Sequence, residues 1–280
     1  MQQFPTKWRD TVDPFSLPYK NFKLTAVLGY PHAGNDVFFA QGIYKEQQVD
    51  VIIKVNRQRG ADVKNEILTL QSLNFPFTPE IIDYDDDMTF RVSIALEGEK
   101  LSTILGENKN LESMQYMAKY GEMLATIHSV KGDFLPVKDR RFFHIPNGEV
   151  LKQEGFEKVY NYLCENKPKE NDVCFCHGDF HYANLLWKNK DISAILDFEL
   201  SGMGIREFDI AWALILRPGQ AFLRTQAEID EFLNGYSKRA SFNYDKIKYY
   251  MAQIYLYFYF SNEKNESYTT FIKNWYEKNL

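Results

Sequence analysis

The chain has 280 residues, a hydrophobic share of 45%, a charged share of 25% and a formal net charge of −5. This length suffices for one large domain or two modest lobes with buried apolar cores. The acidic balance argues against a nucleic-acid partner, because affinity for the phosphate backbone depends largely on clustered Lys and Arg. No run of about 18 apolar residues occurs, and no apolar run follows a basic start. We expect a soluble, cytoplasmic protein with no membrane partner.

The first third of the sequence predicts a small sheet. Five stretches rich in β-branched and aromatic residues are bounded by turn formers and predict strands: 22–30, 36–44, 49–57, 80–85 and 88–96. The first three favour an antiparallel meander. Between the third and the fourth, Val63, Ile67 and Leu70 recur at helical spacing and predict a helix.

Helical patterns dominate after Gly98. Met117, Tyr120 and Leu124 lie on one stripe of a long predicted helix, and the segment 173–202 interrupts the helices with two brief apolar strands and their loops. Strands first and helices afterwards predict an α+β protein. We place a small antiparallel-sheet N-terminal lobe at residues 1–97 and a larger, mostly helical C-terminal lobe at residues 98–280, with a ligand cleft between them.

The segment that carries chemistry reads His-Gly-Asp-Phe-His-Tyr-Ala-Asn over residues 177–184, and Asp197 follows after a short strand and turn. Phosphoryl transfer from ATP requires a group that orients the acceptor hydroxyl and oxygen ligands that hold magnesium against the phosphates. Asp179, Asn184 and Asp197 supply that set of groups. An isolated His-Gly-Asp would more often be a turn, but the three residues at this spacing favour catalysis.

This segment resembles the catalytic loop and metal motif of the aminoglycoside phosphotransferases and choline kinases, which read HGDxxxxN and then a hydrophobic residue, Asp, an aromatic residue and Glu. The resemblance implies a two-lobed, protein-kinase-like fold. It further implies that Asp179 is the catalytic base, that His177 helps to hold the loop, and that Asn184 and Asp197 bind Mg²⁺. Asp209, at the start of a predicted helix, is expected to brace the catalytic loop.

Nucleotide binding is expected in the N-terminal lobe. Lys54 lies in an apolar strand, where an ammonium group is costly unless a phosphate or a carboxylate accompanies it. Glu66 on the following helix is the expected partner, and the pair resembles the lysine and glutamate of kinases. Four further residues are expected near the nucleotide, two in the loop between the first strands and two in the hinge: Gly34, Asn35, Ser93 and Ala95.

The sequence therefore predicts an ATP- and Mg²⁺-dependent small-molecule kinase that phosphorylates a hydroxyl group. Aminoglycosides, choline and sugars are the acceptor types considered, and a cationic acceptor would need carboxylates or an aromatic cage in the helical lobe. Two alternatives stay open: a catalytically silent nucleotide-binding regulatory protein and a protein-kinase-like enzyme. Against the latter, the motifs read His-Gly-Asp and Asp-Phe-Glu, and no Ala-Pro-Glu follows. The oligomeric state, the preference for ATP over GTP and a role in metabolism or antibiotic resistance also stay open.

Overall fold

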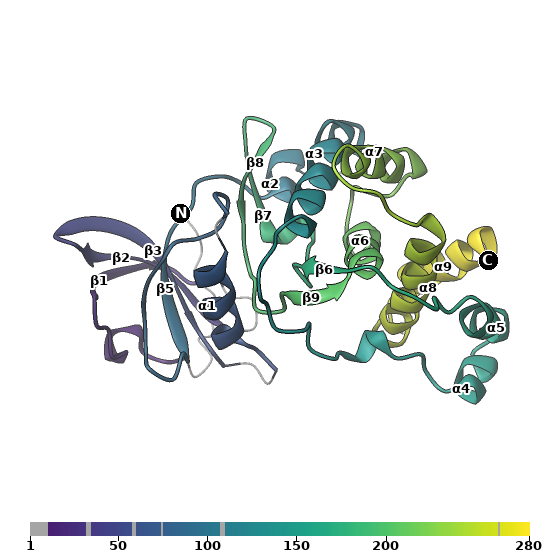
Figure 1. The fold of residues 1–280 in the computed structure, drawn as a ribbon, viewed down its shortest axis with the longest axis horizontal. Coiled ribbons are helices and arrows are strands. Elements are labelled where there is room, and N and C mark those ends of the chain that lie inside the picture. Colours follow the sequence, from purple (N-terminus) through teal and green to yellow (C-terminus); the bar gives the residue numbers. More distant parts are fainter. Residues whose placement is uncertain (1–10, 32–34, 58–59, 74, 107–109, 263) are drawn as a thin grey trace. The chain divides into compact units, whose positions relative to one another are not determined.

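A computed structural model describes residues 11–31, 35–57, 60–73, 75–106, 110–262 and 264–280 (Figure 1). The chain divides into two compact units. One, here called the strand unit, comprises Met1–Lys100 and Asn184–Ser201, and the other, the helical unit, comprises Leu101–Ala183 and Gly202–Leu280. The segment 184–201 thus groups with the strand unit although it follows the catalytic motif in the chain. The sequence-based division at residue 97 stays a prediction.

The strand unit is built on a five-stranded antiparallel sheet in the order β1-β2-β3-β5-β4. Its strands are β1 (Phe22–Gly29), β2 (Asp36–Tyr44), β3 (Gln47–Val55), β4 (Ile81–Tyr84) and β5 (Phe90–Ile94). The predicted strands and the meander of the first three are confirmed. A short 3₁₀ turn, η1 (Pro14–Ser16), precedes the sheet.

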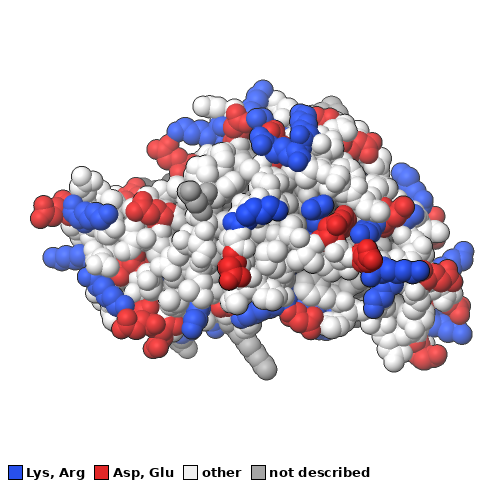
Figure 2. Space-filling model, in the orientation of Figure 1, with Lys and Arg blue, Asp and Glu red and all other residues white. Residues whose placement is uncertain are grey.

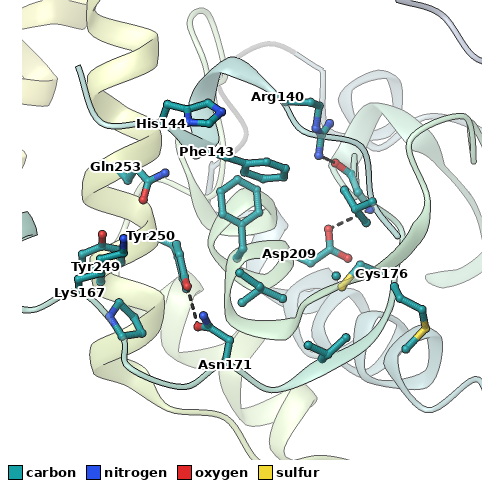
Figure 3. Close-up of a pocket in the computed structure, with 18 of the residues that line it drawn as sticks. Arg140, Phe143, His144, Lys167, Asn171, Cys176, Asp209, Tyr249, Tyr250 and Gln253 are labelled. Carbon is teal, nitrogen blue, oxygen red and sulfur yellow. Dashed lines mark hydrogen bonds between the residues drawn. The ribbon is translucent and has the colours of Figure 1, made fainter. Parts of the chain in front are cut away.

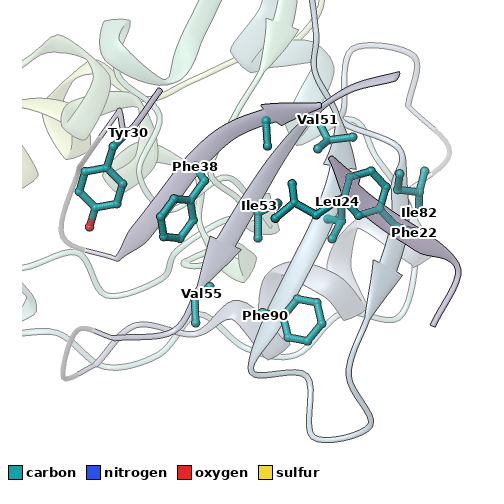
Figure 4. Packing of buried hydrophobic residues seen from close by; sticks show 11 residues of the cluster. Phe22, Leu24, Tyr30, Phe38, Val51, Ile53, Val55, Ile82 and Phe90 are labelled. Carbon is teal, nitrogen blue, oxygen red and sulfur yellow. The ribbon is translucent and has the colours of Figure 1, made fainter. Parts of the chain in front are cut away.

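The core of this sheet is formed by the apolar side chains that point to one of its faces (Figure 4). Successive side chains of a strand point to opposite faces, so Val51, Ile53 and Val55 of β3 share one face and are all buried. Helix α1 (Val63–Ser72) packs against β4 and β5. Its first turn is capped by Asp62, whose side chain accepts a hydrogen bond from the backbone N–H of Asn65 at 3.0 Å.

A hairpin of β7 (Leu185–Lys188) and β8 (Asp191–Ile195) completes the strand unit. Its two turn residues, Asn189 and Lys190, have φ values of 53° and 66°, as a tight hairpin turn requires. Glu99 and Trp187 exchange two backbone hydrogen bonds of 2.9 Å, and the Ile195 N–H donates to the Phe77 carbonyl at 2.8 Å. These bonds join the hairpin to the N-terminal part of the chain.

The helical unit contains eight α-helices among the described residues. They are α2 (Leu101–Leu105), α3 (Asn110–His128), α4 (Gly148–Gln153), α5 (Glu157–Glu165), α6 (Arg206–Leu214), α7 (Gln226–Ser237), α8 (Tyr244–Ser261) and α9 (Glu266–Asn279). A two-stranded sheet of β6 (Val173–Cys176) and β9 (Gly202–Ile205) lies among them, and 3₁₀ turns occupy η2 (Arg141–Phe143) and η3 (Tyr182–Asn184). Helix α7 begins with a capping box of Thr225 and Glu228, a pattern that the sequence itself shows.

Two glycines allow α3 and α7 to approach closely. A Cβ added to Gly121 of α3 would lie 1.9 Å from the Phe232 carbonyl oxygen, and one added to Gly235 of α7 would lie 2.0 Å from the Ala118 carbonyl oxygen. Both distances are far below van der Waals contact. The two backbones therefore touch where any side chain would separate them.

Several aromatic side chains near the C-terminus are part of the core. Tyr268 donates to the Leu216 carbonyl at 2.6 Å, Tyr276 donates to the Ala252 carbonyl at 2.8 Å, and the Tyr255 hydroxyl accepts from the Leu216 N–H at 3.0 Å. Each buried hydroxyl thus has a backbone partner. None of the described helices is long and apolar enough to cross a membrane. On the face shown in Figure 2, basic and acidic side chains are largely interspersed.

Candidate active site

Lys54 of β3 is the centre of a charge cluster inside the strand unit. Its side chain is 7% exposed, and its Nζ lies 3.0 Å from Glu66 Oε2 on α1, 2.7 Å from Asp197 Oδ1 and 2.9 Å from Glu199 Oε2. Burial alone would lower the pKa of Lys54, but the carboxylates raise it above its usual value. The lysine is therefore charged at neutral pH. The structure brings together Lys54, Glu66 and Asp197, three of the residues singled out in the sequence.

Glu66 is buried and shared between two cations. Its other oxygen, Oε1, accepts from Arg91 Nη2 at 2.9 Å and from the Phe198 N–H at 3.3 Å. Burial favours the neutral acid, but Arg91 and then Lys54 outweigh it and lower the pKa of Glu66. The glutamate is ionised, so it fixes the lysine against α1.

The cluster carries an excess of negative charge. Three carboxylates, those of Glu66, Asp197 and Glu199, face two cations, Lys54 and Arg91, which leaves one uncompensated negative charge. Burial and the repulsion from Asp197 raise the pKa of Glu199, although Lys54 opposes this shift. A further cation would relieve this repulsion. Oxygen ligands are those that Mg²⁺ prefers, so the donor set fits this metal.

Asp197 and Asn184 are brought near one another by the β7–β8 hairpin. The Leu196 N–H donates to the Asn184 carbonyl at 2.8 Å, so the residue before Asp197 is bonded to Asn184. Asp197 has a φ of 67°, which is uncommon for a residue with a side chain. Its side chain is 34% exposed, so it can reach a ligand as well as Lys54. Backbone strain of this kind often occurs at functional sites.

The other residues that the sequence predicts near a nucleotide have different environments. Asn35 is 4% exposed, and its side chain donates to Glu199 Oε2 at 3.0 Å, so it joins the Lys54 cluster. Gly34 lies outside the described residues. Ser93 is buried in a strand that is paired on both sides, and the Ala95 N–H donates to the Asp50 carbonyl at 2.9 Å. An adenine edge would therefore have to bond to backbone groups other than the Ala95 N–H.

The loop that carries the His-Gly-Asp motif begins in the helical unit and is held by Asp209 of α6. Asp209 Oδ2 accepts from the His177 N–H at 2.9 Å, and its Oδ1 accepts from the Gly178 N–H at 3.1 Å. His177 is fully buried, and its Nδ1 accepts from the Asp179 N–H at 3.3 Å. His128 of α3 also contacts Asp209, with Nε2 at 3.2 Å from Oδ2. The bracing expected of Asp209 is present in the geometry.

Asp179 is held by two side chains of the helical unit. Trp212 of α6 donates its Nε1–H to Asp179 Oδ1 at 2.7 Å, and His181 Nε2 lies 3.6 Å from Oδ2. Burial would raise the pKa of Asp179, but His181 first and then Arg217 and His177 outweigh it and lower the pKa to about 2. Asp179 is thus an ionised carboxylate with a fixed orientation, and it can accept a hydrogen bond from a hydroxyl group.

A cavity of about 650 Å³ lies in the helical unit beside this loop (Figure 3). It is lined by the segment 137–145, by residues of β6 and β9, and by parts of α6 and α8. Gly178 and Asp209 contribute to its wall, so it reaches the residue that precedes Asp179. Its volume is in the range of small-molecule sites. Two aromatic residues of α8, Tyr249 and Tyr250, line it.

Several residues of the site were not found from the sequence. Glu199 is the last position of the Asp-aromatic-Glu motif, which alone gives it no role, and Arg91 gives no signal beyond its strand. Trp212 lies one helical turn after Asp209, so the helix period could have indicated it. Arg140 lies in an irregular segment, where no periodicity indicates which side chains face inward.

The fold, the Lys54 cluster and the His-Gly-Asp loop together define a class of protein. An antiparallel sheet whose third strand carries a lysine paired to a helix glutamate, together with a helical unit that carries a His-Gly-Asp loop, is the arrangement of protein-kinase-like enzymes. The sequence model of the phosphotransferase enzyme family matches residues 45–250 of this chain. The chain belongs to this family.

Individual relatives are more distant. An aminoglycoside 3'-phosphotransferase of Niallia circulans is 34% identical over 58 residues, which is 21% of this chain and 22% of that protein. The match thus spans about a fifth of that relative. The choline kinase LicA of Streptococcus pneumoniae has a similar structure, with a TM-score of 0.54 and 17% identity over 93% of this chain and 92% of the other. An ADP-bound aminoglycoside phosphotransferase has a TM-score of 0.54 and 17% identity over 89% and 86% of the two chains.

Proposed function

We propose that the protein is an ATP- and Mg²⁺-dependent kinase that transfers a phosphoryl group to the hydroxyl of a small molecule. The observation that carries this proposal is the cluster in which Lys54 Nζ lies within 3.0 Å of Glu66 and Asp197. A buried lysine with more carboxylates than it can neutralise is a site for phosphate and a divalent cation together. Family membership and an ADP-bound relative support the same activity.

Nucleotide binding is proposed for the strand unit. Lys54 neutralises phosphate charge, and Glu66 keeps the ammonium in place from α1. Asn184 and Asp197 would hold Mg²⁺ through their oxygens. When bound, the metal ion supplies positive charge that stabilises the negative oxygens of the transferred group. Gly34 and Asn35 are proposed near the phosphates, and the hinge that contains Ser93 and Ala95 near the adenine.

The acceptor hydroxyl is proposed to bond to Asp179. With its pKa lowered to about 2, the carboxylate is a weak base, so it orients the hydroxyl and accepts the proton late, as the phosphoryl group departs from ATP. His177 holds the backbone of this loop by accepting the Asp179 N–H. Catalysis would consist mainly of positioning and of charge stabilisation.

A catalytically silent regulatory protein is the competing hypothesis, because such a protein would also bind nucleotide. The Asp179 contacts favour an enzyme, since Trp212 and His181 orient a carboxylate that nucleotide binding alone would not require. A protein-kinase-like activity is disfavoured by the motifs of the loop. No observation favours a peptide acceptor.

The test is phosphorylation of a panel of hydroxyl compounds by the wild type and by Asp179→Ala. The panel should contain an aminoglycoside, choline, several sugars and aromatic alcohols, with product detection by mass spectrometry. We expect turnover in the wild type and a loss of about 10²–10⁴-fold in kcat in the variant. ADP binding measured by calorimetry should be retained. The exposed Asp87→Ala is the control, and equal turnover by Asp179→Ala would reject the role.

A further inference from the structure

The cavity of the helical unit has a positively charged wall. Arg140 donates from Nη2 to the Gly178 carbonyl at 2.6 Å, and its guanidinium lies over the rings of Phe142, Phe143 and Trp212. No carboxylate of the described residues forms an ion pair with it, and its Nε has no hydrogen-bond partner among them. Burial lowers the pKa of Arg140, although Asp179 and Asp209 oppose the shift. A largely buried cation without a paired anion leaves room for a negative ligand.

A second cation lines the same cavity. Lys167 is an exposed lining residue, and Figure 3 draws it on the other side of the cavity from Arg140. The remaining basic lining residue, His144, is paired with Asp139, with Nε2 at 2.7 Å from Oδ2. Two cations thus lie at separate places along the wall.

The cavity offers no carboxylate that is available to a cationic ligand. Asp209 is the one acidic residue among the described lining residues, and it is 1% exposed. Its two oxygens already accept from the His177 and Gly178 N–H groups and contact His128. A cation placed here would meet Arg140 and Lys167 without compensation. The wall therefore disfavours the cationic acceptors considered from the sequence.

Aromatic rings form much of the remaining wall. The ring centres of Phe143 and Phe208 are 4.5 Å apart, and those of Phe208 and Tyr250 are 5.5 Å apart. The two amide side chains of the wall already have partners. Gln253 donates to the Phe142 carbonyl at 2.8 Å, and Asn171 accepts from the Tyr250 hydroxyl at 2.7 Å. Such a surface suits a flat, apolar body.

The cavity wall is connected to the catalytic carboxylate. Trp212, which bonds to Asp179, also stacks with Phe142 at 4.5 Å between ring centres and lies beneath the Arg140 guanidinium. Arg140 in turn holds the carbonyl of Gly178, the residue before Asp179. A molecule in the cavity would lie against Arg140, which contacts both the Trp212 ring and the Gly178 carbonyl.

We propose that this cavity is the acceptor site and that it takes a flat, largely apolar alcohol that carries a negative charge, such as a carboxylate. This assignment rests on the proposed kinase function and adds the class of acceptor to it. Arg140 and Lys167 select the anion, and the rings of Phe143, Phe208 and Tyr250 hold the flat body. The hydroxyl then faces the loop that carries Asp179.

The test uses three probes of one shape and different charge: 3-(hydroxymethyl)benzoate, 3-(hydroxymethyl)benzamide and 3-(hydroxymethyl)benzylamine. Their binding to the full chain with Mg²⁺ and ADP is measured by calorimetry. We expect the benzoate to bind about tenfold more tightly than the amine, which corresponds to about 1.4 kcal/mol. Lys167→Glu should reduce the ratio of the two dissociation constants, amine to benzoate, and Arg140→Gln should reduce it further. The exposed Lys158→Glu on α5 should leave this ratio unchanged.

The assignment is overturned if the amine binds as tightly as the benzoate, if neither substitution changes the ratio, or if no probe binds at millimolar concentration. Because Lys167 is exposed, Lys167→Glu gives a result even where Arg140→Gln does not fold. ADP binding in the same samples separates this outcome from failure of the proposed function. If the wild type binds ADP but does not prefer the benzoate over the amine, only the acceptor class is rejected. If the wild type does not bind ADP, the proposed kinase function is rejected.

Discussion

A tryptophan of α6 helps to orient the Asp179 carboxylate. The indole Nε1–H of Trp212 bonds to Oδ1 at 2.7 Å and leaves Oδ2 on the side of His181. One oxygen is thus occupied by a rigid donor. Oδ2 is the oxygen that we propose as the acceptor of the substrate proton.

Trp212→Phe keeps the ring and removes this donor. A hydrogen bond to a charged group is worth about 1.5 kcal/mol, so we expect kcat to fall about tenfold while the KM for ATP stays unchanged. Steady-state kinetics with a saturating acceptor would measure the change. Trp275→Phe makes the same substitution in α9 against Tyr255 and should have no effect. Unchanged kcat in Trp212→Phe would mean that the indole does not position the carboxylate.

His128 makes stability depend on pH. Burial lowers its pKa, but the hydrogen bond to Asp209 and the effect of Cys174 outweigh this and raise it from 6.5 to about 9. A group with a raised pKa in the folded state contributes stability below its unfolded pKa and loses the contribution as pH rises through the folded pKa. The contribution of His128 to the free energy of unfolding should therefore decrease between about pH 6.5 and pH 9, and the neighbouring Cys174, whose pKa is lowered to about 5, opposes this decrease.

His128→Asn should remove the falling contribution, because asparagine does not titrate, so the free energy of unfolding should fall less or rise more with pH than in the wild type. Urea unfolding at several pH values would give the slope for each protein. The exposed His144→Asn serves as the control and should retain the slope of the wild type. A slope in His128→Asn equal to that of the wild type would show that His128 does not contribute to the pH dependence.

At the scale of elements, the packing of α3 on α7 depends on the absence of side chains. In an exposed helix, Gly→Ala stabilises by up to about 1 kcal/mol. At Gly235 the added Cβ would lie 2.0 Å from the Ala118 carbonyl oxygen, so the helices must separate. The sign of the effect is reversed by this contact.

We expect Gly235→Ala to destabilise the protein by about 1–3 kcal/mol, the usual cost of overpacking. Chemical denaturation followed by circular dichroism would measure it. Asn234→Ala, at the neighbouring exposed position of α7, is the matched control for helix propensity and should change stability little. Stabilisation by Gly235→Ala would show that the two helices can move apart at no cost.

At the scale of the whole molecule, ligand binding should raise the melting temperature through the strand unit. At a concentration of 100 times Kd, Mg²⁺ and ADP would stabilise the folded state by about 2.7 kcal/mol, or roughly 5–10 °C. Calorimetric scans with and without EDTA would test this. Asp197→Ala should abolish the Mg²⁺-dependent part of the shift, and Asp87→Ala should keep it. A full shift in Asp197→Ala would reject Asp197 as a metal ligand.

Much of the fold could be predicted because its signals are local. The strands of the sheet, the long helix α3 and the capping box of α7 depend on alternation, helical period and capping residues. The partner of Lys54 could be predicted because a buried ammonium requires a carboxylate. The contacts of Arg140 and Trp212 could not, since they join segments far apart in the chain. The aromatic residues of α8 recur along the helix, and this recurrence does not distinguish a residue of the core from one that lines a cavity.

The order of the chain affects how the strand unit can form during synthesis. Asp197 and Glu199, two of the three carboxylates around Lys54, lie in the segment Asn184–Ser201, which is translated after the part Leu101–Ala183 of the helical unit. When only the first hundred residues of the nascent chain have been synthesised, Glu66 is therefore the sole carboxylate of this cluster that can pair with Lys54. We infer that the N-terminal sheet matures late, once the β7–β8 hairpin has emerged and docked.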